Sequence, residues 1–286
     1  MKRFLYRALL RINAGFEEIL RAGRAVPVQL TVDGADSNTA RFVLNYAAQI
    51  TAAANIALAG ETLRRRAGPL AAPGGLDLRP RVWFNPDLES RNYYVPGIIA
   101  MLVMLVGLML TSMAIVREKE TGTIEQIMVT PIRPVEFILG KCAPFAVVGL
   151  IDTALVSAVG LFWFDIPFRG SFALLLLGTA LFLLGTLGIG LFISTVSRTQ
   201  QQAMMTTFFF FFPAMLFSGF IFPISSMPEP FQWLSLADPL RHFLVIIRGV
   251  FLKGVGAEVL WPELAALLGM GAAVMAFAVS RFRKTL

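Results

Sequence analysis

Residues 95–116 have the sequence VPGIIAMLVMLVGLMLTSMAIV, in which no side chain is charged. Because an α-helix rises about 1.5 Å per residue, a helix of this length crosses a hydrocarbon core of about 30 Å. Four later segments have similar lengths and apolar compositions, at residues 144–164, 172–193, 203–222 and 260–279. We therefore predict an α-helical polytopic membrane protein with five transmembrane helices.

The whole composition agrees with this fold class. The chain has 286 residues, of which 56% are apolar and only 15% charged, whereas about a quarter of a soluble domain is charged. A single cysteine, Cys142, and a single histidine, His242, exclude a disulfide framework and a His- or Cys-based metal centre. The net charge of +7 indicates topology and anionic lipid contact rather than a nucleic-acid partner, because basic residues gather beside membrane spans.

Residues 1–94 have a different composition, with 13 of the 25 basic and 8 of the 18 acidic residues. Residues 27–32 alternate between apolar and polar like a half-buried strand, and Ser37 or Asn38 can cap a long helix that follows. We predict a small α/β domain here, followed by a membrane domain at residues 95–286.

The positive-inside rule predicts the orientation of the membrane domain. If the loop 117–141 is cytoplasmic, the short cytoplasmic segments hold eight basic residues and the opposite side holds four. Residues 1–94 would then be extracytoplasmic and the C-terminus cytoplasmic. Export of residues 1–94 requires an earlier spanning helix, and the apolar run in residues 1–10 is too short. A helix upstream of Met1 is the favoured explanation, and a reversed orientation is the alternative.

The loop 117–141 has the sequence REKETGTIEQIMVTPIRPVEFILGK. Gly122 can end the helical extension of the first span, and Thr123 with Gln126 fits a capping box. A short amphipathic helix is predicted from there to Pro131, with one apolar face made by Ile124, Ile127 and Met128. From these residues alone the loop is either a connector or a docking element.

Two other features of the membrane domain are informative. Asp152 lies near the middle of a span, where a carboxylate is costly to bury, so it is a candidate residue of the translocation pathway or a partner of a neighbouring helix. Residues 223–253 are too polar to cross the membrane. They are predicted to form short external helices, broken at Pro228, Pro230 and Pro239, that enter the outer leaflet as a re-entrant segment.

The sequence of the loop resembles a known family. Residues 117–126, followed by Thr130-Pro131, Glu136 and Gly140-Lys141, look like the signature loop of ABC-2 type export permeases. The segments 198–202, 218–223 and 281–284 are also similar to that family. The resemblance covers residues 27–286 and is greatest to bacterial permeases with a large external domain. Those permeases typically have six spans, so by this resemblance the chain lacks the first transmembrane helix.

The resemblance implies a membrane permease subunit of an exporter in the bacterial inner membrane. It implies ABC ATPase subunits as partners, and a second permease in a homodimer or a related heterodimer. The residues that it implies for ATPase docking are Glu118, Glu120, Gly122, Thr123, Ile124, Glu125, Ile127, Met128, Thr130 and Pro131. A non-transporting scaffold or a defective truncated half-permease is the alternative.

The chain is not expected to be an enzyme or to bind a cofactor itself. A P-loop requires Gly-x-x-x-x-Gly-Lys-Ser/Thr, but Gly140-Lys141 is followed by Cys142, and position 135 is Val. ATP would therefore be bound and hydrolysed by the partner subunit. The substrate cannot be inferred from the sequence.

Overall fold

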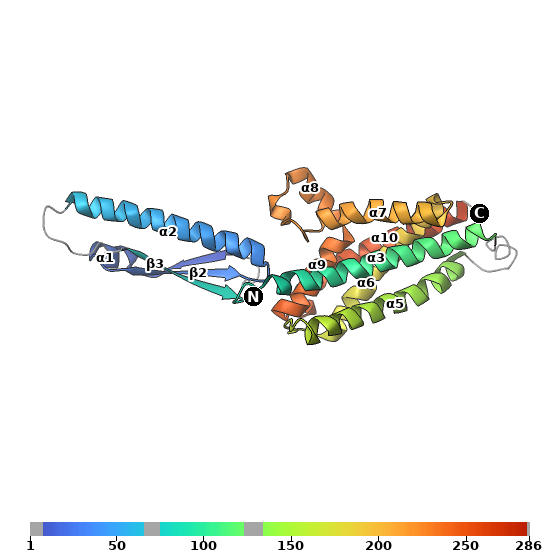
Figure 1. Cartoon of the computed structure of the whole chain (residues 1–286), viewed down its shortest axis with the longest axis horizontal. Coiled ribbons are helices and arrows are strands. Elements are labelled where there is room, and N and C mark those ends of the chain that lie inside the picture. Colours follow the sequence, from blue (N-terminus) through green and yellow to red (C-terminus); the bar gives the residue numbers. More distant parts are fainter. Residues whose placement is uncertain (1–7, 66–74, 123–133, 285–286) are drawn as a thin grey trace. The chain divides into compact units, whose positions relative to one another are not determined.

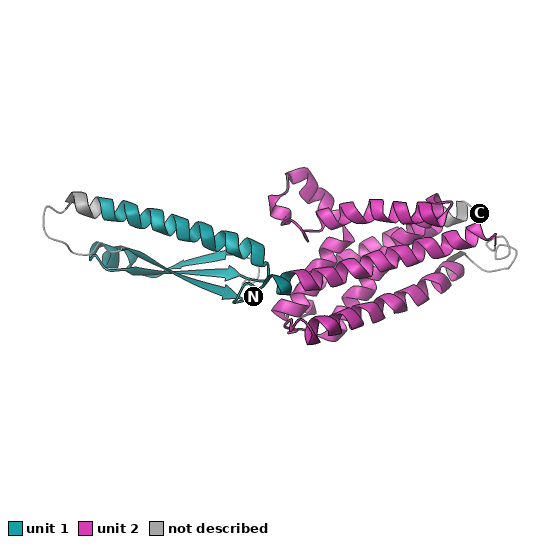
Figure 2. Cartoon of the chain, in the orientation of Figure 1, with its two compact units in different colours: residues 1–93 teal, residues 94–286 magenta. Residues whose placement is uncertain are grey.

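The computed structural model describes residues 8–65, 75–122 and 134–284. The chain divides into two compact units, Met1–Tyr93 and Tyr94–Leu286 (Figure 2). The division falls where the sequence composition changes from mixed polar to mainly apolar.

Unit 1 contains a three-stranded sheet with the strand order β1-β2-β3 (Figure 1). The antiparallel pair joins β1 to β2, with Leu10 opposite Leu30, and the parallel pair joins β2 to β3, with Leu30 opposite Pro80. The elements of unit 1 are β1 (Ala8–Ile12), α1 (Phe16–Arg21), β2 (Val26–Asp33), α2 (Ser37–Arg65) and β3 (Leu76–Trp83).

The long helix α2 packs along one face of the sheet. Alternate residues of β2 are buried on that face, as period-2 patterning requires. Leu30, Val32 and Ala40 form the core, and Val43 and Leu44 of α2 pack against it. The strand at residues 27–32 and the following helix were both predicted from the sequence, and both are confirmed.

The residue that caps α2 differs from the prediction. Asp36 is the capping residue, because its carboxylate accepts hydrogen bonds from the backbone N–H of Thr39 at 3.1 Å and from the Thr39 hydroxyl at 2.6 Å. Ser37 is already the first residue of the helix, and its side chain is fully buried. The prediction of Ser37 or Asn38 was therefore wrong by one or two residues.

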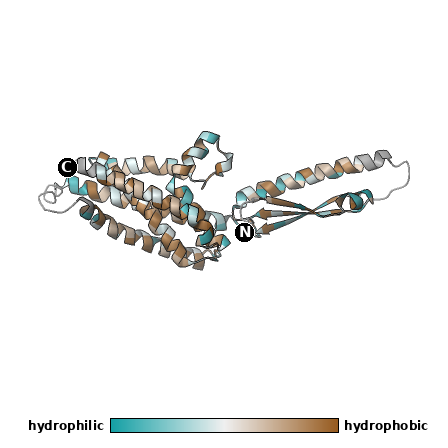
Figure 3. Ribbon diagram, turned by 180° about the vertical axis from the view of Figure 1, so that it is seen from behind, coloured by the Kyte–Doolittle hydropathy of each residue, from teal (hydrophilic) through white to brown (hydrophobic). Residues whose placement is uncertain are grey.

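Unit 2 is helical, and its ribbon is mainly hydrophobic along the length of the long helices (Figure 3). Its long helices are α3 (Ser90–Glu120, which begins in unit 1), α5 (Pro134–Phe162), α6 (Phe172–Val196), α7 (Gln200–Phe217) and α10 (Ala257–Lys284). The helices α3, α5, α6 and α10 are long and apolar enough to cross a membrane. They lie at four of the five predicted spans.

The fifth candidate differs from the sequence prediction. At residues 203–222 a span was expected, but α7 begins at Gln200 and ends at Phe217. It is not among the five helices of the described residues that are long and apolar enough to cross a membrane. Its first three residues are glutamines, which lower its mean hydropathy, and Gly219 turns the chain with a φ of 81°. The helix that is apolar enough instead is α2 of unit 1. The fold class, a helical polytopic membrane protein with a small sheet, is confirmed.

Glycine residues of α6 allow its neighbours to approach closely. A Cβ built on Gly185 would lie 3.6 Å from the Cα of Gly271 in α10, and one on Gly190 would lie 3.2 Å from the carbonyl oxygen of Leu108 in α3. A Cβ on Gly178 would lie 2.8 Å from Ile246. Small residues thus bring three helices against α6, as is usual for helices that pack in membranes.

Short helices connect α7 to α10, as the proline positions predicted. The elements are η1 (Ile224–Ser226), α8 (Glu229–Leu234), η2 (Ser235–Ala237), α9 (Pro239–Arg248) and the π-helical turn η3 (Gly249–Lys253). Pro228 is the N-cap of α8, and Pro239 is the first residue of α9. The predicted break at Pro230 is wrong, because Pro230 is the second residue of α8, where its missing N–H breaks no helical hydrogen bond. In α9 the apolar residues Leu240, Phe243 and Ile247 are fully buried.

Candidate functional site

The last turn of α3, which precedes the predicted docking loop, makes polar contacts with three other helices. Glu118 forms an ion pair with Lys141 of α5, Lys119 donates a hydrogen bond to the carbonyl oxygen of Ser194 in α6, and Glu120 binds Gln200 of α7. We call these three consecutive residues, Glu118, Lys119 and Glu120, the α3 clamp. Successive helical residues point about 100° apart, so three neighbours in the sequence can reach three different helices.

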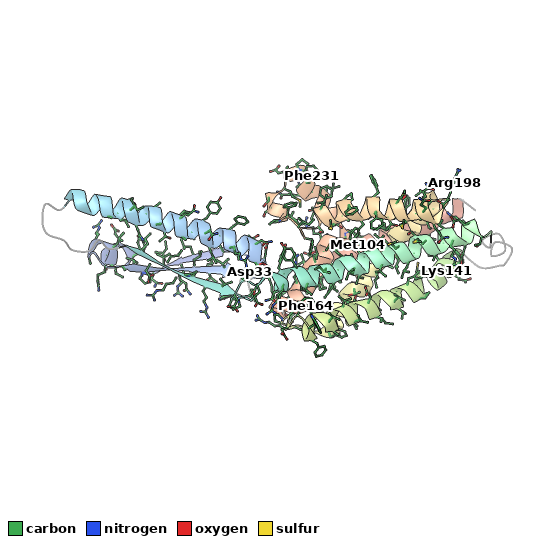
Figure 4. All side chains as sticks on the ribbon, viewed as in Figure 1. Asp33, Met104, Lys141, Phe164, Arg198 and Phe231 are labelled. Carbon is green, nitrogen blue, oxygen red and sulfur yellow. The ribbon has the colours of Figure 1, made fainter. Side chains whose placement is uncertain are left out.

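The helix ends joined by the α3 clamp lie at one end of unit 2. Figure 4 shows Lys141 and Arg198 at that end, and Phe164 and Phe231 toward the opposite end. The end of α3 at Glu120 and the connection between α6 and α7 are therefore on one side of the helices. The turn after α5 and the segment with α8 are on the other side (Figure 1).

Two charges of the clamp complement the dipoles of the helices that they bind. The backbone N–H of Gln200, the first residue of α7, donates to Glu120 Oε1 at 2.9 Å, and the Gln200 side chain donates to Oε2. Lys119 binds the Ser194 carbonyl in the last turn of α6. A negative charge at a helix N-terminus and a positive charge at a C-terminus each contribute about 0.3–1 kcal/mol at exposed sites.

The ion pair between Glu118 and Lys141 is partly shielded from solvent. The side chain of Glu118 is 18% exposed and that of Lys141 is 37% exposed. The Lys141 ammonium also lies 5.9 Å from the centre of the Phe137 ring, within the range of a cation–π interaction. Partial burial weakens screening by salt, so this pair joins α3 to α5 more firmly than a fully exposed pair would.

Local sequence signals define the helix ends at the clamp. Gly122, with a φ of 73°, follows the last residues of α3, and its N–H donates to the carbonyl oxygen of Lys119 at 3.3 Å. The predicted end of α3 before Gly122 is therefore confirmed. At the start of α7, Thr199 accepts from the N–H of Gln202, and the Gln202 side chain accepts from the N–H of Arg198. Thr199 and Gln202 follow the Thr-x-x-Gln pattern of a capping box, but Gln202 accepts from the N–H of Arg198, one residue before the N-cap, and sequence reasoning had not used this signal.

The structure describes only part of the predicted docking site. Of the predicted residues, Glu118, Glu120 and Gly122 are described, and those outside the described residues are Thr123, Ile124, Glu125, Ile127, Met128, Thr130 and Pro131. Glu118 and Glu120 were expected to face a partner protein, whereas both bind groups of this chain. Sequence reasoning missed their partners, Lys141 and Gln200.

Asp152 lies in α5 beside a close contact with α6. It is half-buried, and among the described residues its Oδ2 atom is buried without a hydrogen-bond partner. One turn earlier, a Cβ on Gly149 would lie 2.7 Å from the side chain of Leu183 of α6. A carboxylate that is not fully hydrogen-bonded at this depth is costly, which is the property expected of a functional residue within a span.

A second polar cluster joins α9 to α10 at the other end of unit 2. His242 hydrogen-bonds through Nδ1 to Glu263 of α10 and through Nε2 to the carbonyl oxygen of Leu236 at 3.0 Å. Asp238 caps α9 by accepting from the N–H of Leu240 at 3.0 Å. We call Asp238, His242 and Glu263 the α9 cluster. Sequence reasoning had not connected these residues.

Burial and hydrogen bonding shift the pKa values of two members of this cluster. Burial raises the pKa of Asp238 to about 7, although the Leu240 N–H and the nearby His242 and Arg241 act in the opposite direction. The hydrogen bond to Glu263 raises the pKa of His242 above its usual value, against the effect of burial. Among residues 8–65, 75–122 and 134–284, no group of three or more His, Cys, Asp or Glu side chains could hold a metal ion.

Known proteins resemble this chain over nearly its whole length. The family model described as ABC-2 family transporter protein matches residues 5–280. The probable multidrug ABC transporter permease YbhR of Escherichia coli (strain K12) is 33% identical over 276 residues, which cover 96% of this chain and 73% of that protein. The probable multidrug ABC transporter permease YbhS of the same organism is 35% identical over 253 residues, covering 87% and 65% respectively. The inner membrane transport permease YhhJ, also from this organism, is 30% identical over 286 residues, covering 98% and 74%.

Proposed function

The chain belongs to the ABC-2 family of transporter proteins, and we propose that it is the permease subunit of an exporter that uses ATP hydrolysed on separate ATPase subunits. Four long apolar helices in unit 2 support a role within the membrane. The Gly140-Lys141 pair lacks the Ser or Thr that would bind Mg²⁺ in a P-loop, which supports placing ATP on a partner protein.

The α3 clamp is the observation that carries this proposal. Residues 123–131 connect α3 to α5, and the ATPase would dock on this segment through the apolar face of Ile124, Ile127 and Met128. A movement of the docking segment displaces the end of α3. Because the clamp ties that end to α5, α6 and α7, the displacement reaches four helices together.

In this proposal Glu118 and Glu120 are positioning residues rather than direct contacts of the ATPase. Their carboxylates bind Lys141 and Gln200, so they fix the end of α3, from which the docking segment continues, to α5 and α7. The end of α3 must be held rigidly, because a flexible helix end would absorb the movement before it reached the membrane helices. Asp152, about two thirds of the way along α5, is the proposed residue of the substrate pathway.

The proposed topology has residues 1–94 outside the cytoplasm and the α3 clamp on the cytoplasmic side. Basic residues support this orientation, since the end of unit 2 with Lys141 and Arg198 belongs to the side that holds eight of twelve short-segment positive charges. The relatives YbhR and YbhS carry the description multidrug permease. We therefore propose apolar or amphipathic small molecules as the substrates.

The test uses the full-length permease co-expressed with its ATPase. The double substitution Glu125→Lys with Ile127→Asp places charge in the proposed contact, where burying an unpaired carboxylate costs several kcal/mol. Capture of the ATPase on the tagged permease and vanadate-sensitive efflux should both be lost, with membrane yield unchanged. Arg133→Gln, a charge change two residues beyond Pro131, is the control and should retain capture.

Two results would contradict the proposal. If the double variant still captures the ATPase and supports efflux, residues 123–131 are only a connector. If the unaltered permease neither captures an ATPase nor supports efflux, the chain is a membrane scaffold without transport activity.

A further inference from the structure

The outward face of α2 in unit 1 is apolar but exposed. Residues 42–60 contain no charged residue, although charged and polar residues normally occupy the solvent side of a surface helix. On this face Phe42 is 66% exposed, Tyr46 64%, Ile50 68% and Ile56 75%. Large apolar side chains that follow one another along a helix in this way mark an interaction surface.

The exposed residues have the spacing of a helix-pairing seam. Positions 42, 46, 49, 53, 56 and 60 alternate steps of four and three, which is the 3.5-residue period of paired helices. All six are exposed in the structure. We call this row the α2 seam: Phe42, Tyr46, Gln49, Ala53, Ile56 and Gly60.

Lipid does not cover this seam, although α2 is apolar enough to cross a membrane. The opposite side of α2 packs on the sheet through Val43 and Leu44. Both outer strands of that sheet are edges, and they expose Arg11 on β1 and Arg79 and Arg81 on β3. Open sheet edges with charged side chains do not occur within the hydrocarbon region, so α2 does not cross the bilayer and its seam is open to a protein partner.

We propose that the α2 seam pairs with the α2 seam of a second copy of this permease. The inference rests on the proposed function, in which two permeases form one exporter. A surface that meets its own copy across a two-fold axis must be self-complementary. An uncharged, mainly apolar row satisfies this condition, because identical charged residues would face one another at such an axis and repel.

The size of the seam favours a partner that is already close. Nineteen residues span about 28 Å, and a helix is about 10 Å wide, so the seam covers roughly 300 Å² on each partner. A stable complex between freely diffusing proteins needs about 800 Å² on each side. A second permease paired in the same membrane is held at a high effective concentration, so a small contact is sufficient.

Cysteine cross-linking in membranes tests this pairing. Cys142, which is buried, is first replaced by Ser, and Ala53→Cys then places one thiol near the middle of the seam. Oxidation of the full-length permease, co-expressed with its ATPase, should give covalent dimers. Arg81→Cys, equally exposed but on β3, is the matched control and should give at least tenfold fewer dimers.

A second variant tests whether the seam itself holds the copies together. Tyr46→Glu with Ile56→Glu, added to Ala53→Cys, should reduce cross-linking at least fivefold, because like charges would face one another across the seam. Native gels and ATPase capture are measured on the same membranes, so a failure of the exporter proposal is recognised separately. If two copies co-migrate and the ATPase is captured, but Ala53→Cys gives no more dimer than Arg81→Cys, the pairing of the seams is refuted. A permease that runs as a single copy refutes it equally.

Discussion

The backbone N–H of Gln200, the first residue of α7, donates a hydrogen bond of 2.9 Å to the carboxylate of Glu120, the last residue of α3. The two residues are 80 positions apart in the sequence. The end of one helix is thereby fixed to the start of another, directly beside the proposed docking segment. In the proposed mechanism this contact transmits a movement of the docking segment from α3 to α7, and it also stabilises the junction of the two helices.

We predict that Glu120→Lys uncouples ATP hydrolysis from transport. The substitution removes the acceptor for the Gln200 N–H and places a positive charge at the N-terminus of α7, and both changes weaken the junction between α3 and α7. ATPase capture should remain near the unaltered level while efflux falls at least fivefold. Glu120→Gln, whose amide oxygen can still accept the hydrogen bond, should retain most of the efflux. Loss of capture in Glu120→Lys would instead identify Glu120 as a docking contact.

Exchanging the two residues of the ion pair between Glu118 and Lys141 should preserve the contact between α3 and α5. We predict that Glu118→Lys and Lys141→Glu each lower the melting temperature, because each places two like charges at the junction of α3 and α5. The exchanged double variant should recover much of the loss, with a coupling energy of about 0.5–3 kcal/mol in a double-mutant cycle. Thermal unfolding of the purified permease in detergent measures this. Strictly additive effects of the two substitutions would show that the pair contributes nothing to joining the helices.

Local sequence rules predicted the helices well where neighbouring residues determine them. Apolar runs located α3, α5, α6 and α10, Gly122 marked a helix end, and the predicted break at Pro239 falls between η2 and α9. These signals act within one turn of the chain. The error at the start of α2 was small for the same reason, since Asp36 and Ser37 are both good capping residues and only the fold selects between them.

The contacts of the site could not be predicted in this way. Glu118 reaches Lys141 over 23 positions, and Lys119 reaches Ser194 over 75. A carboxylate beside a predicted loop is normally a solvated residue, so nothing local to Glu118 or Glu120 indicates a partner. The α2 seam was missed for a different reason. The sequence predicted the helix but not which of its faces packs on the sheet, and the structure shows which apolar residues of α2 remain outside the core.

Asp152→Asn should reduce efflux without disturbing ATPase capture. The buried Oδ2 atom lacks a hydrogen-bond partner among the described residues, so the carboxylate is retained at a cost that a function in the substrate pathway would explain. We expect a several-fold loss of transport of a cationic or amphipathic dye, with unchanged membrane yield. Asp165→Asn, the same substitution at an exposed position after α5, is the control and should transport normally. Normal efflux in Asp152→Asn would assign this carboxylate to helix packing.

We expect the α9 cluster to make the stability of the segment at residues 223–253 depend on pH. The pKa of His242 is raised in the folded protein, chiefly by its hydrogen bond to Glu263, so its contribution is complete below the ordinary histidine pKa and is lost as pH rises through the raised value. Burial raises the pKa of Asp238 to about 7, so folding favours its protonated form, and this contribution is lost between about pH 4 and pH 7. Both groups therefore stabilise the fold more at low pH.

We predict that the melting temperature of the permease in detergent falls by several degrees between pH 5 and pH 8.5. Two variants separate this effect from titration elsewhere in the chain. Asp238→Asn retains an N-cap for α9, because Asn caps as well as Asp, and should remove the part of the decrease that occurs below pH 7. Glu263→Gln removes the carboxylate that binds His242, and should abolish the part that follows the raised pKa of His242. If both variants show the same pH profile as the unaltered protein, the cluster does not control the stability of this segment.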